Sequence, residues 1–439
     1  MKKILCLLVC LATVFSLTAC AGLDVIRETE LPPLPTPELK TETPAPEEPS
    51  EAPVVESEPV VIPEEDPEGA DLGEQILVFF SSTTETEYAP DDEKQPILNF
   101  SYSTPQLIMN RNTAAADKIN EELRLLDELY YSGYGSDMGK NHLYEVALDH
   151  YSYAHGKAEG IETLFSSSRA VDCCRADGSV VSFLYRTSVY TGGSQGEFSN
   201  VGRTYSTQTG EKLTLDELSE DYEALRAVIA ENIIALARED KELYTEISKN
   251  GIDADTALTA LIREDFWYFA ADGMVFFPAW GELRPAEERI PSFTIPYEKL
   301  IGVIDDQYLP ADREADGTLV IERVSDVPEG TIKSIGLLTV SDGEDLYLRA
   351  EGSVYDVQIS SAAYYDVEAG ERFYETERHW YASFMTDCAL QLRALLPEGM
   401  PDLMITYTDS AYEQHRLLLS ENGVDGTPAL VDDTIIAVG

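Results

Sequence analysis

The segment Thr191-Gly192-Gly193-Ser194-Gln195-Gly196 is the stretch of this chain whose residue types come nearest to a catalytic pattern. It fits G-x-S-x-G, the turn that presents a nucleophilic serine beside an oxyanion hole. That turn requires a helix directly after the serine, whereas the following residues EFSNVGRTYST have the pattern of a strand. We therefore expect a glycine loop with positive φ angles between two paired strands, and no catalytic role for Ser194.

Metal and acid–base chemistry have no recognisable spacing in the sequence. The histidines form no HxxxH or HExxH pattern and no cluster with cysteine; they are His142, His150, His155, His379 and His415. Acidic pairs occur throughout the chain, so no two of them stand out as a glycosidase pair. The sequence thus predicts no catalytic residue, no metal site, no cofactor and no enzyme activity.

The six cysteines fall into two groups by their position in the sequence. Cys6 and Cys10 belong to an N-terminal apolar run, and Cys20 ends it. Cys173, Cys174 and Cys388 remain, an odd number that gives no disulfide framework. Either they are buried free thiols, or one of the adjacent pair is bonded to Cys388.

The N-terminus has the pattern of an export signal. Lys2 and Lys3 precede an apolar run at residues 4–15, too short to span a bilayer, and Leu17-Thr18-Ala19-Cys20 follows. This ending resembles the bacterial lipobox, which implies that residues 1–19 are removed and that the Cys20 thiol carries a diacylglycerol anchor. The alternative is an ordinary signal peptide with a chance cysteine. We expect an extracytoplasmic lipoprotein anchored to the cell membrane.

Residues 20–75 are predicted to form a tether rather than a core. They are rich in proline and glutamate and nearly free of aromatic residues, so they bury too little apolar surface to offset the entropy of ordering. About 55 residues at roughly 3.1 Å each would reach on the order of 170 Å when fully extended.

The charge of the chain restricts its partners. Lys and Arg number 31 and Asp and Glu number 81, a formal net charge of −50. A polyanion of this kind does not bind nucleic acid through its phosphates. Basic proteins, or neutral ligands held by a local site, are the expected partners, unless the acidity serves only solubility.

Hydrophobic patterns predict an α+β fold: antiparallel sheets with packed helices in two linked subdomains, 76–190 and 191–305, and a C-terminal all-β, sandwich-like domain at 312–439. In the first subdomain we expect strands at 76–90, 96–108, 143–155, 170–176 and 179–191. A helix at 110–133 should begin at Asn112 or Thr113 and bury one apolar face, made by Ile119, Leu123, Leu126 and Leu129.

The second subdomain repeats this arrangement. We expect a strand and turn at 197–215, a helix at 216–240 burying Leu225, Ile229, Ile233 and Leu236, a hairpin around Asp272-Gly273, and a strand entering a short helix at 290–300. The C-terminal part reads as short strands with one amphipathic stretch at 379–399.

Several of these segments resemble paired bacterial extracytoplasmic domains of unknown function, DUF4163 and DUF3298. The matching motifs are the loop at 191–196, Thr209–Leu218, the aromatic hairpin at 272–300 and Lys118–Leu123, in family order over roughly 85–301. Such pairs occur in the lysozyme-sensing anti-sigma factor of bacilli and as an accessory module of some peptidoglycan deacetylases. The family's Ala-His is Ser194-Gln195 here, and its Asn-Pro-Tyr loop is Pro278-Ala279-Trp280.

The resemblance implies a binding protein of the cell envelope rather than an enzyme. In the sensor, the region that corresponds to the surroundings of Trp280 belongs to the surface that engages lysozyme. The residues predicted to contact a ligand are therefore Trp280, Pro278, Glu282, Pro285, Gly192, Gly193, Ser194 and Gln195. Lysozyme, another basic protein or peptidoglycan is the expected ligand. Trp280 is either exposed for binding or a plug in the hairpin core. An accessory role in peptidoglycan processing and a purely structural envelope role are the alternatives.

Overall fold

The computed structural model describes most of the chain after residue 75. The described ranges are 76–133, 139–155, 164–193, 196–249, 253–283, 290–313, 317–328, 330–331, 343, 345–366, 372–395, 403–420 and 429–436. The expected signal peptide, Cys20, the tether, Ser194, Gln195 and Pro285 lie outside them. None of the helices in these ranges has the length and apolarity that a membrane crossing requires.

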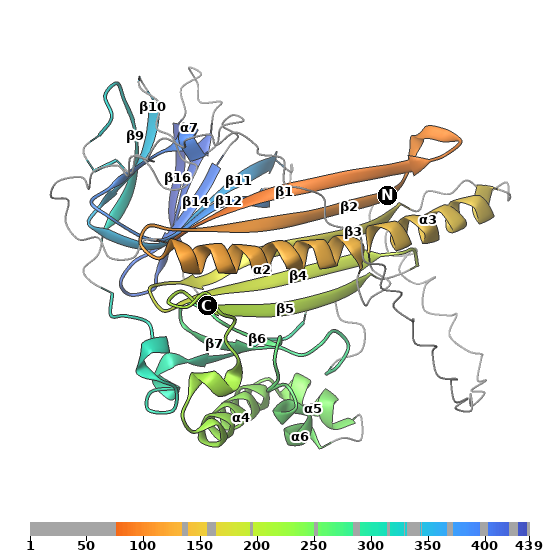
Figure 1. The fold of residues 1–439 in the computed structure, drawn as a ribbon, viewed down its shortest axis with the longest axis horizontal. Coiled ribbons are helices and arrows are strands. Elements are labelled where there is room, and N and C mark those ends of the chain that lie inside the picture. Colours follow the sequence, from red (N-terminus) through yellow and green to blue (C-terminus); the bar gives the residue numbers. More distant parts are fainter. Residues whose placement is uncertain are drawn as a thin grey trace, which may run out of the picture. The chain divides into compact units, whose positions relative to one another are not determined.

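One ten-stranded sheet runs through the described residues in the order β16-β15-β14-β11-β12-β1-β2-β3-β4-β5 (Figure 1). Neighbouring strands are antiparallel except β2 and β3, which are parallel. The strands are β1 (Ile76–Ala89), β2 (Asp92–Met109), β3 (Phe165–Ala176), β4 (Val180–Tyr190), β5 (Glu197–Ser206), β11 (Ser353–Asp366), β12 (Arg372–Thr386), β14 (Leu403–Thr408), β15 (Gln414–Ser420) and β16 (Ala429–Ile436).

Two smaller sheets complete the strands, in the orders β13-β10-β9 and β6-β7-β8. Their members are β6 (Trp267–Phe269), β7 (Gly273–Phe276), β8 (Phe293–Pro296), β9 (Thr318–Val324), β10 (Asp345–Glu351) and β13 (Ala389–Gln391). The helices are α2 (Thr113–Ser132), α3 (Lys140–His155), α4 (Tyr222–Glu239), α5 (Lys241–Lys249), α6 (Ala254–Thr259) and α7 (Leu392–Leu395), with 3-10 turns η1 (Leu215–Leu218), η2 (Tyr297–Lys299) and η3 (Asp306–Tyr308). The predicted α+β class is confirmed.

The C-terminal strands form a two-layered β region, as predicted. Apolar residues of β10, β11, β12, β14 and β15 share one core, which Leu77 of β1 also enters. Leu77 lies opposite Ala382 in the β1–β12 pair, so strands from before and after position 312 belong to one continuous sheet. The boundaries at 190 and 312 thus remain predictions about folding units.

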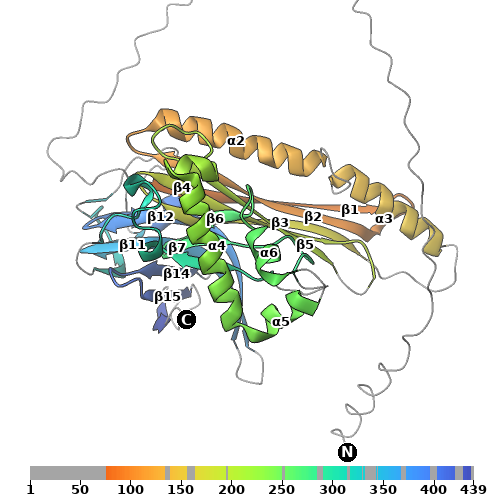
Figure 2. The same cartoon turned by 90° about the horizontal axis from the view of Figure 1, so that it is seen from below.

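Helices α2 and α3 cover one face of strands β1–β4 (Figure 2). Asn112 caps α2 by accepting a hydrogen bond from the Ala115 backbone N–H at 3.3 Å. Ile119 and Leu123 are fully buried and Leu126 is partly buried against the same core, as predicted. The prediction for Leu129 is wrong: it is 45% exposed, because the helix has turned that side away from the sheet.

Residues 143–155, predicted as a strand, lie in helix α3. Leu143, Ala147 and Tyr151 are buried against Leu98, Phe100 and Phe165 of the sheet. This four-residue spacing is that of a helix face. The aromatic and β-branched residues between them obscured it in the sequence. The described part of the stretch 379–399, predicted as amphipathic, lies in β12, β13 and α7.

A second layer is made by α4–α6 and the sheet β6-β7-β8. Leu225, Ile229 and Ile233 of α4 are fully buried with Phe269 and Ile295 in one core, as predicted, and Leu236 is partly buried against it. The hairpin β6–β7 and the strand 293–296 followed by η2 also form as predicted. This layer approaches β5 closely at Gly202, where a Cβ would lie 1.8 Å from the Trp267 carbonyl oxygen. Only glycine fits there.

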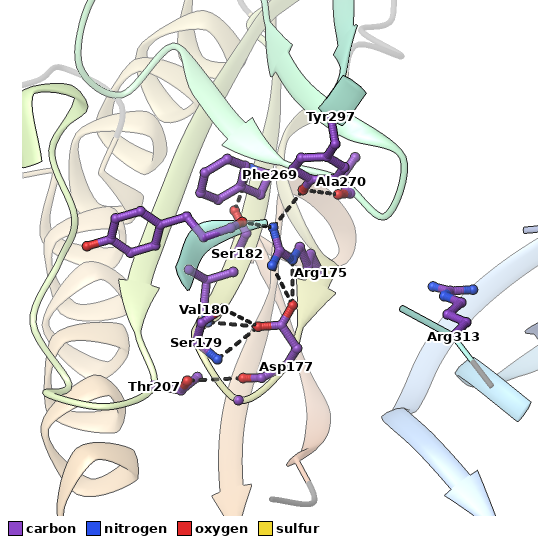
Figure 3. A network of polar contacts seen from close by, with 12 residues as sticks. Arg175, Asp177, Ser179, Val180, Ser182, Thr207, Phe269, Ala270, Tyr297 and Arg313 are labelled. Atoms are coloured by element: carbon purple, nitrogen blue, oxygen red, sulfur yellow. Dashed lines mark hydrogen bonds and ion pairs between the residues drawn. The ribbon is translucent and has the colours of Figure 1, made fainter. Parts of the chain in front are cut away.

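The buried Arg175 at the end of β3 joins the two layers (Figure 3). Its guanidinium donates to the Tyr297 hydroxyl at 2.8 Å, to the Tyr308 carbonyl at 2.7 Å and to the Asp177 carboxylate at 2.6 Å. Its charge also lies 5.2 Å from the centre of the Phe269 ring. Arg175 therefore fixes the smaller sheet against the larger one and sets the space between them.

Two of the motifs quoted for the family resemblance pack against each other. Asn120 of α2 exchanges two hydrogen bonds with the backbone of Leu107, where β2 has lost its pairing to β3. Lys118 donates to the Thr209 carbonyl oxygen at 3.0 Å, and the turn at Gly210 has φ +74°. A Cβ at Gly210 would lie 2.8 Å from the Ala115 oxygen, so this turn needs glycine for two reasons.

Candidate functional site

A cleft of about 900 Å³ lies on the face of β1–β5 opposite the α2 and α3 layer. This volume is near the upper end of the roughly 300–1,000 Å³ that small-molecule sites occupy. Its floor is the sheet, and its wall includes Tyr268 of β6, Phe277 just after β7, and Ile290 and Ser292 just before β8. The second layer held by Arg175 thus supplies the wall.

The period-2 alternation of β3 separates the two faces. Phe165, Ser167, Arg169 and Val171 are buried towards the helices, while Ser168 and Ala170 between them are exposed. The other strands of the floor also present small polar side chains to the cleft, including Ser82, Thr84, Ser101, Ser103, Ser188 and Asn200.

Four of these side chains form a continuous row across the strands. Thr84 lies opposite Ser101, Ser101 opposite Ser168, and Ser168 opposite Ser188. We call these four residues the hydroxyl row. With neighbouring strands about 4.8 Å apart, the row crosses four strands over roughly 15 Å. It ends on β5 at Phe198, the partner of Ser188.

Charge in the cleft is confined to paired groups. Arg186 and Asp172 form an ion pair at 2.5 Å on the floor. Arg169 also borders the cleft, but its guanidinium pairs with Asp127 of α2 on the far side of the sheet. The pKa of Tyr268 is raised, first because burial disfavours the phenolate and then because Cys174 and Asp272 lie nearby. Tyr268 therefore stays neutral, and the lining carries little net charge.

The Trp280 loop contacts the cleft at Phe198, and the glycine loop lies just before Phe198 in the sequence. Gly192 and Gly193 have φ angles of +92° and +99°, which confirms the predicted glycine loop between paired strands. The Trp280 ring contacts the Phe198 ring edge-on, with centroids 6.2 Å apart and an interplanar angle of 64°. Trp280 is half-buried. Its burial is therefore intermediate between the two alternatives, an exposed side chain and a plug in the hairpin core.

The other predicted site residues support the loop in different ways. Pro278 is buried. Glu282 receives two hydrogen bonds from Arg263, at 2.9 and 2.6 Å, and one from the Ala279 backbone N–H at 2.7 Å. These contacts close the turn in which Gly281 has φ +76°. Glu282 thus holds the Trp280 loop in shape.

The cysteines remain free thiols in the structure. Cys173 and Cys388 are buried, Cys174 is partly buried, and none of the three is bonded to another. Of the two alternatives, the disulfide to Cys388 is therefore not formed. Among the described side chains, no group of three or more histidines, cysteines and carboxylates is placed to hold a metal ion.

Sequence reasoning missed the cleft and its hydroxyl row. The hydroxyl residues were visible in SSTT, NFSYS and FSSS of β1, β2 and β3, but serine and threonine also fill neighbouring positions there, such as the buried Ser167, so no alternation marked the cleft face. The row is assembled by the parallel β2–β3 pair. That pairing joins strands separated by two helices, and no local pattern predicts it.

Comparison with known proteins gives only distant similarities. No protein-family model and no curated protein matches the sequence. The chain is similar to a solved structure of a DUF3298 family member from Bacteroides fragilis, with 17% identity, a TM-score of 0.39, and coverage of 52% of this chain and 94% of that one. A DUF3298 family protein from Pseudomonas aeruginosa gives 14% identity, a TM-score of 0.33, and coverage of 53% and 96%.

These structural neighbours are members of the DUF3298 family, one half of the pair that the sequence motifs resemble. They carry no information about an activity or a ligand. The resemblance to DUF4163, to the lysozyme-sensing anti-sigma factor and to the deacetylase module rests on the sequence motifs alone.

Proposed function

We propose that this chain is a non-catalytic, lipid-anchored binding protein of the cell envelope, which holds an extracellular ligand at the cleft and its Phe198–Trp280 end. The observation that carries this proposal is the cleft itself: about 900 Å³ of space over a sheet face lined with small hydroxyl groups. Such a concave site with a few aromatic groups is typical of ligand binding.

The chemistry of the lining favours binding over catalysis. The lining residues in the described ranges include no histidine, and the acidic group among them, Asp172, is paired with Arg186. A serine nucleophile needs a base within hydrogen-bond reach, and a general acid needs a group that titrates near neutral pH. The serines and threonines here are suited instead to donating and accepting hydrogen bonds.

The proposed anchor and tether would hold this site at the outer face of the membrane. Cys20 with its diacylglycerol group would hold the chain, and residues 21–75 would let the folded part reach into the wall. Cell-wall material and basic proteins that enter the wall are then the ligands within reach. Lysozyme is the first basic partner to test, because the chain carries a net charge of −50 and the sensor that it resembles engages lysozyme. An accessory role beside a peptidoglycan-processing enzyme is compatible with the same site.

The proposal is tested with the full-length lipidated chain in detergent micelles. Saturable binding is measured to hen lysozyme and to purified peptidoglycan sacculi, each at low and at 150 mM salt. Binding of either one at 150 mM salt that weakens in Trp280→Ala supports the proposal. Binding of neither, or binding that vanishes by 150 mM salt and ignores Trp280→Ala, overturns it, because charge attraction alone then accounts for the contact.

A further inference from the structure

We infer that the cleft binds an uncharged oligosaccharide, laid along the hydroxyl row with its sugar faces against the aromatic wall. This inference rests on the proposed function, since it names the ligand class of that same site. The motif resemblance implies peptidoglycan as one possible ligand, but it assigns no uncharged sugar chain to this cleft, and the structural neighbours assign no ligand.

The floor supplies the hydrogen-bonding side of such a site. Each hydroxyl of the row formed by Thr84, Ser101, Ser168 and Ser188 can both donate and accept a hydrogen bond, as each sugar hydroxyl can. Consecutive members of the row lie one strand apart. The row is roughly 15 Å long, which suits a chain of a few linked sugars rather than a single sugar ring. Ser82 and Ser103, a facing pair on β1 and β2, widen this surface.

The wall supplies the apolar side. Tyr268 and Phe277 have ring centroids 6.0 Å apart and both border the cleft. Phe198 stands at the end of the row with Trp280 beside it. A pyranose presents C–H groups on its faces and hydroxyls around its rim. A cleft with aromatic rings on one side and hydroxyls on the other therefore matches both parts of a sugar.

The electrostatics select an uncharged ligand. Acidic residues number 81 in the chain, yet Asp172 is the acidic group among the lining residues of the described ranges, and Arg186 neutralises it at 2.5 Å. A basic ligand would find no unpaired carboxylate on this floor. An anionic ligand would meet the field of a chain with net charge −50. The floor is therefore a neutral polar surface, which suits an uncharged ligand.

A polypeptide ligand fits this floor less well. Extended peptides bind by adding a strand to a sheet edge, where backbone N–H and C=O groups are open. The hydroxyl row lies on the face of the sheet, and its strands β2, β3 and β4 are each paired on both sides. Side-chain hydroxyls, not backbone groups, are offered to the ligand.

The test uses the full-length lipidated chain in detergent and isothermal titration with three neutral probes: tetramers of N-acetylglucosamine, of β-1,4-glucose and of α-1,4-glucose. The de-acetylated glucosamine tetramer and tetragalacturonate serve as cationic and anionic probes of equal length. We expect at least one neutral tetramer to bind saturably, with Kd changing less than twofold between 20 and 300 mM salt.

Two variants locate the binding. Ala170 lies exposed on the cleft face of β3, so Ala170→Trp should fill the cleft without disturbing the core, and should weaken binding at least tenfold. Ala114→Trp, at an exposed position of α2 on the other side of the sheet, is the control and should bind as wild type. The double variant Ser168→Ala/Ser188→Ala removes two hydroxyls with almost no change in volume. It should weaken binding threefold to tenfold, and it keeps the test valid if Ala170→Trp does not fold.

Failure of all three neutral tetramers to bind overturns the inference, as does binding that both the Ala170→Trp and the double-serine variants leave unchanged. Preference for the cationic tetramer, lost at high salt, overturns it as well. Lysozyme or sacculus binding in the same preparation then decides the proposed function separately. If either persists while the neutral tetramers fail, the envelope-binding role stands and only the ligand class is wrong.

Discussion

The indole of Trp280 packs edge-on against the ring of Phe198, with their centroids 6.2 Å apart. Phe198 lies at the start of β5 in the large sheet, and Trp280 follows β7 of the small sheet, so the contact joins the two sheets at one end of the cleft. The half-buried tryptophan is thus anchored on one side and accessible on another. This combination is typical of residues that dominate binding energy at interfaces.

Trp280→Ala should weaken lysozyme binding by about 2 kcal/mol or more if Trp280 is such an anchor. Phe198→Leu is the matched variant: it keeps an apolar side chain under the indole but loses the edge-on ring contact, and should cost less than half as much. Titration calorimetry of the full-length chain at 150 mM salt measures both. The association rate should also fall as salt rises, because the acidic chain attracts a basic partner at long range. A Trp280→Ala variant with wild-type affinity would remove this loop from the binding surface.

The sequence predicted the local elements well where one periodicity dominated. The helix at α4 and the hairpin around Asp272-Gly273 were predicted from spacing and turn chemistry, and the structure confirms them. The cap of α2 was predicted at Asn112 or Thr113, and the structure places it at Asn112. The prediction from the sequence was wrong for α3, because the aromatic residues between Leu143, Ala147 and Tyr151 give the segment the pattern of a strand. Helical order there comes from packing on the sheet, which a local pattern does not contain.

Site prediction from the sequence was limited for a related reason. Gly192, Gly193 and Trp280 stand out in the sequence because glycine allows positive φ angles and because tryptophan is a large side chain with one polar group. The hydroxyl row does not stand out, because single serines on the solvent face of a strand are common. Only the register of four strands shows that Thr84, Ser101, Ser168 and Ser188 are neighbours.

Replacing Cys20 with serine should abolish lipid attachment, because the acyl group needs the thiol. Intact-mass spectrometry of the wild-type protein extracted from membranes should show a mature chain beginning at Cys20 and carrying a diacylglycerol increment. The Cys20→Ser protein should retain its signal segment or lose its membrane association. A wild-type mature chain without added mass at Cys20 would show that the segment is an ordinary signal peptide.

Limited proteolysis should cut first within residues 21–75, whose composition disfavours a packed core. A second cut is expected near 308–317, between the parts that we predict as separate folding units. The products of that second cut should stay associated on size-exclusion chromatography, because β1 pairs with β12 across it. Early cleavage mainly inside 200–300 would contradict the predicted organisation, since that range contains the buried α4 core.

Arg175→Met should destabilise the fold by roughly 3–5 kcal/mol, because it leaves the hydrogen-bonding groups of Tyr297 and Tyr308 buried without their donor. Arg186→Met is the matched control. Its guanidinium is about half exposed, with 52% side-chain exposure, while Asp172 has 13%, so loss of this pair should cost about 1–2 kcal/mol, less than the loss of the fully buried Arg175 contacts. Urea unfolding followed by tryptophan fluorescence measures both. Equal losses in the two variants would contradict the role of Arg175 in holding the β6-β7-β8 layer.

Stability should fall as pH rises through the alkaline range, and Cys388 should account for part of the fall. Burial raises the pKa of the Cys388 thiol from its ordinary value near 9 to about 11. The folded protein therefore holds this proton more tightly than the unfolded chain does, so the contribution is complete below pH 9 and is lost as pH approaches 11. Between pH 8 and pH 10 the loss from this one group is roughly 1 kcal/mol.

Cys388→Ala removes the titrating group. Cys174→Ala is a second test of the same effect, because burial raises the pKa of the Cys174 thiol to about 12 and its removal should also make the decline shallower. Free energies of unfolding from urea titrations at pH 8, 9 and 10 give the slope for each variant. Cys388→Ala lowers stability at pH 8, because it leaves a small cavity, but the decline towards pH 10 should be shallower than in the wild type. A slope identical to the wild type would show that the Cys388 thiol ionises as readily in the folded protein as in the unfolded chain.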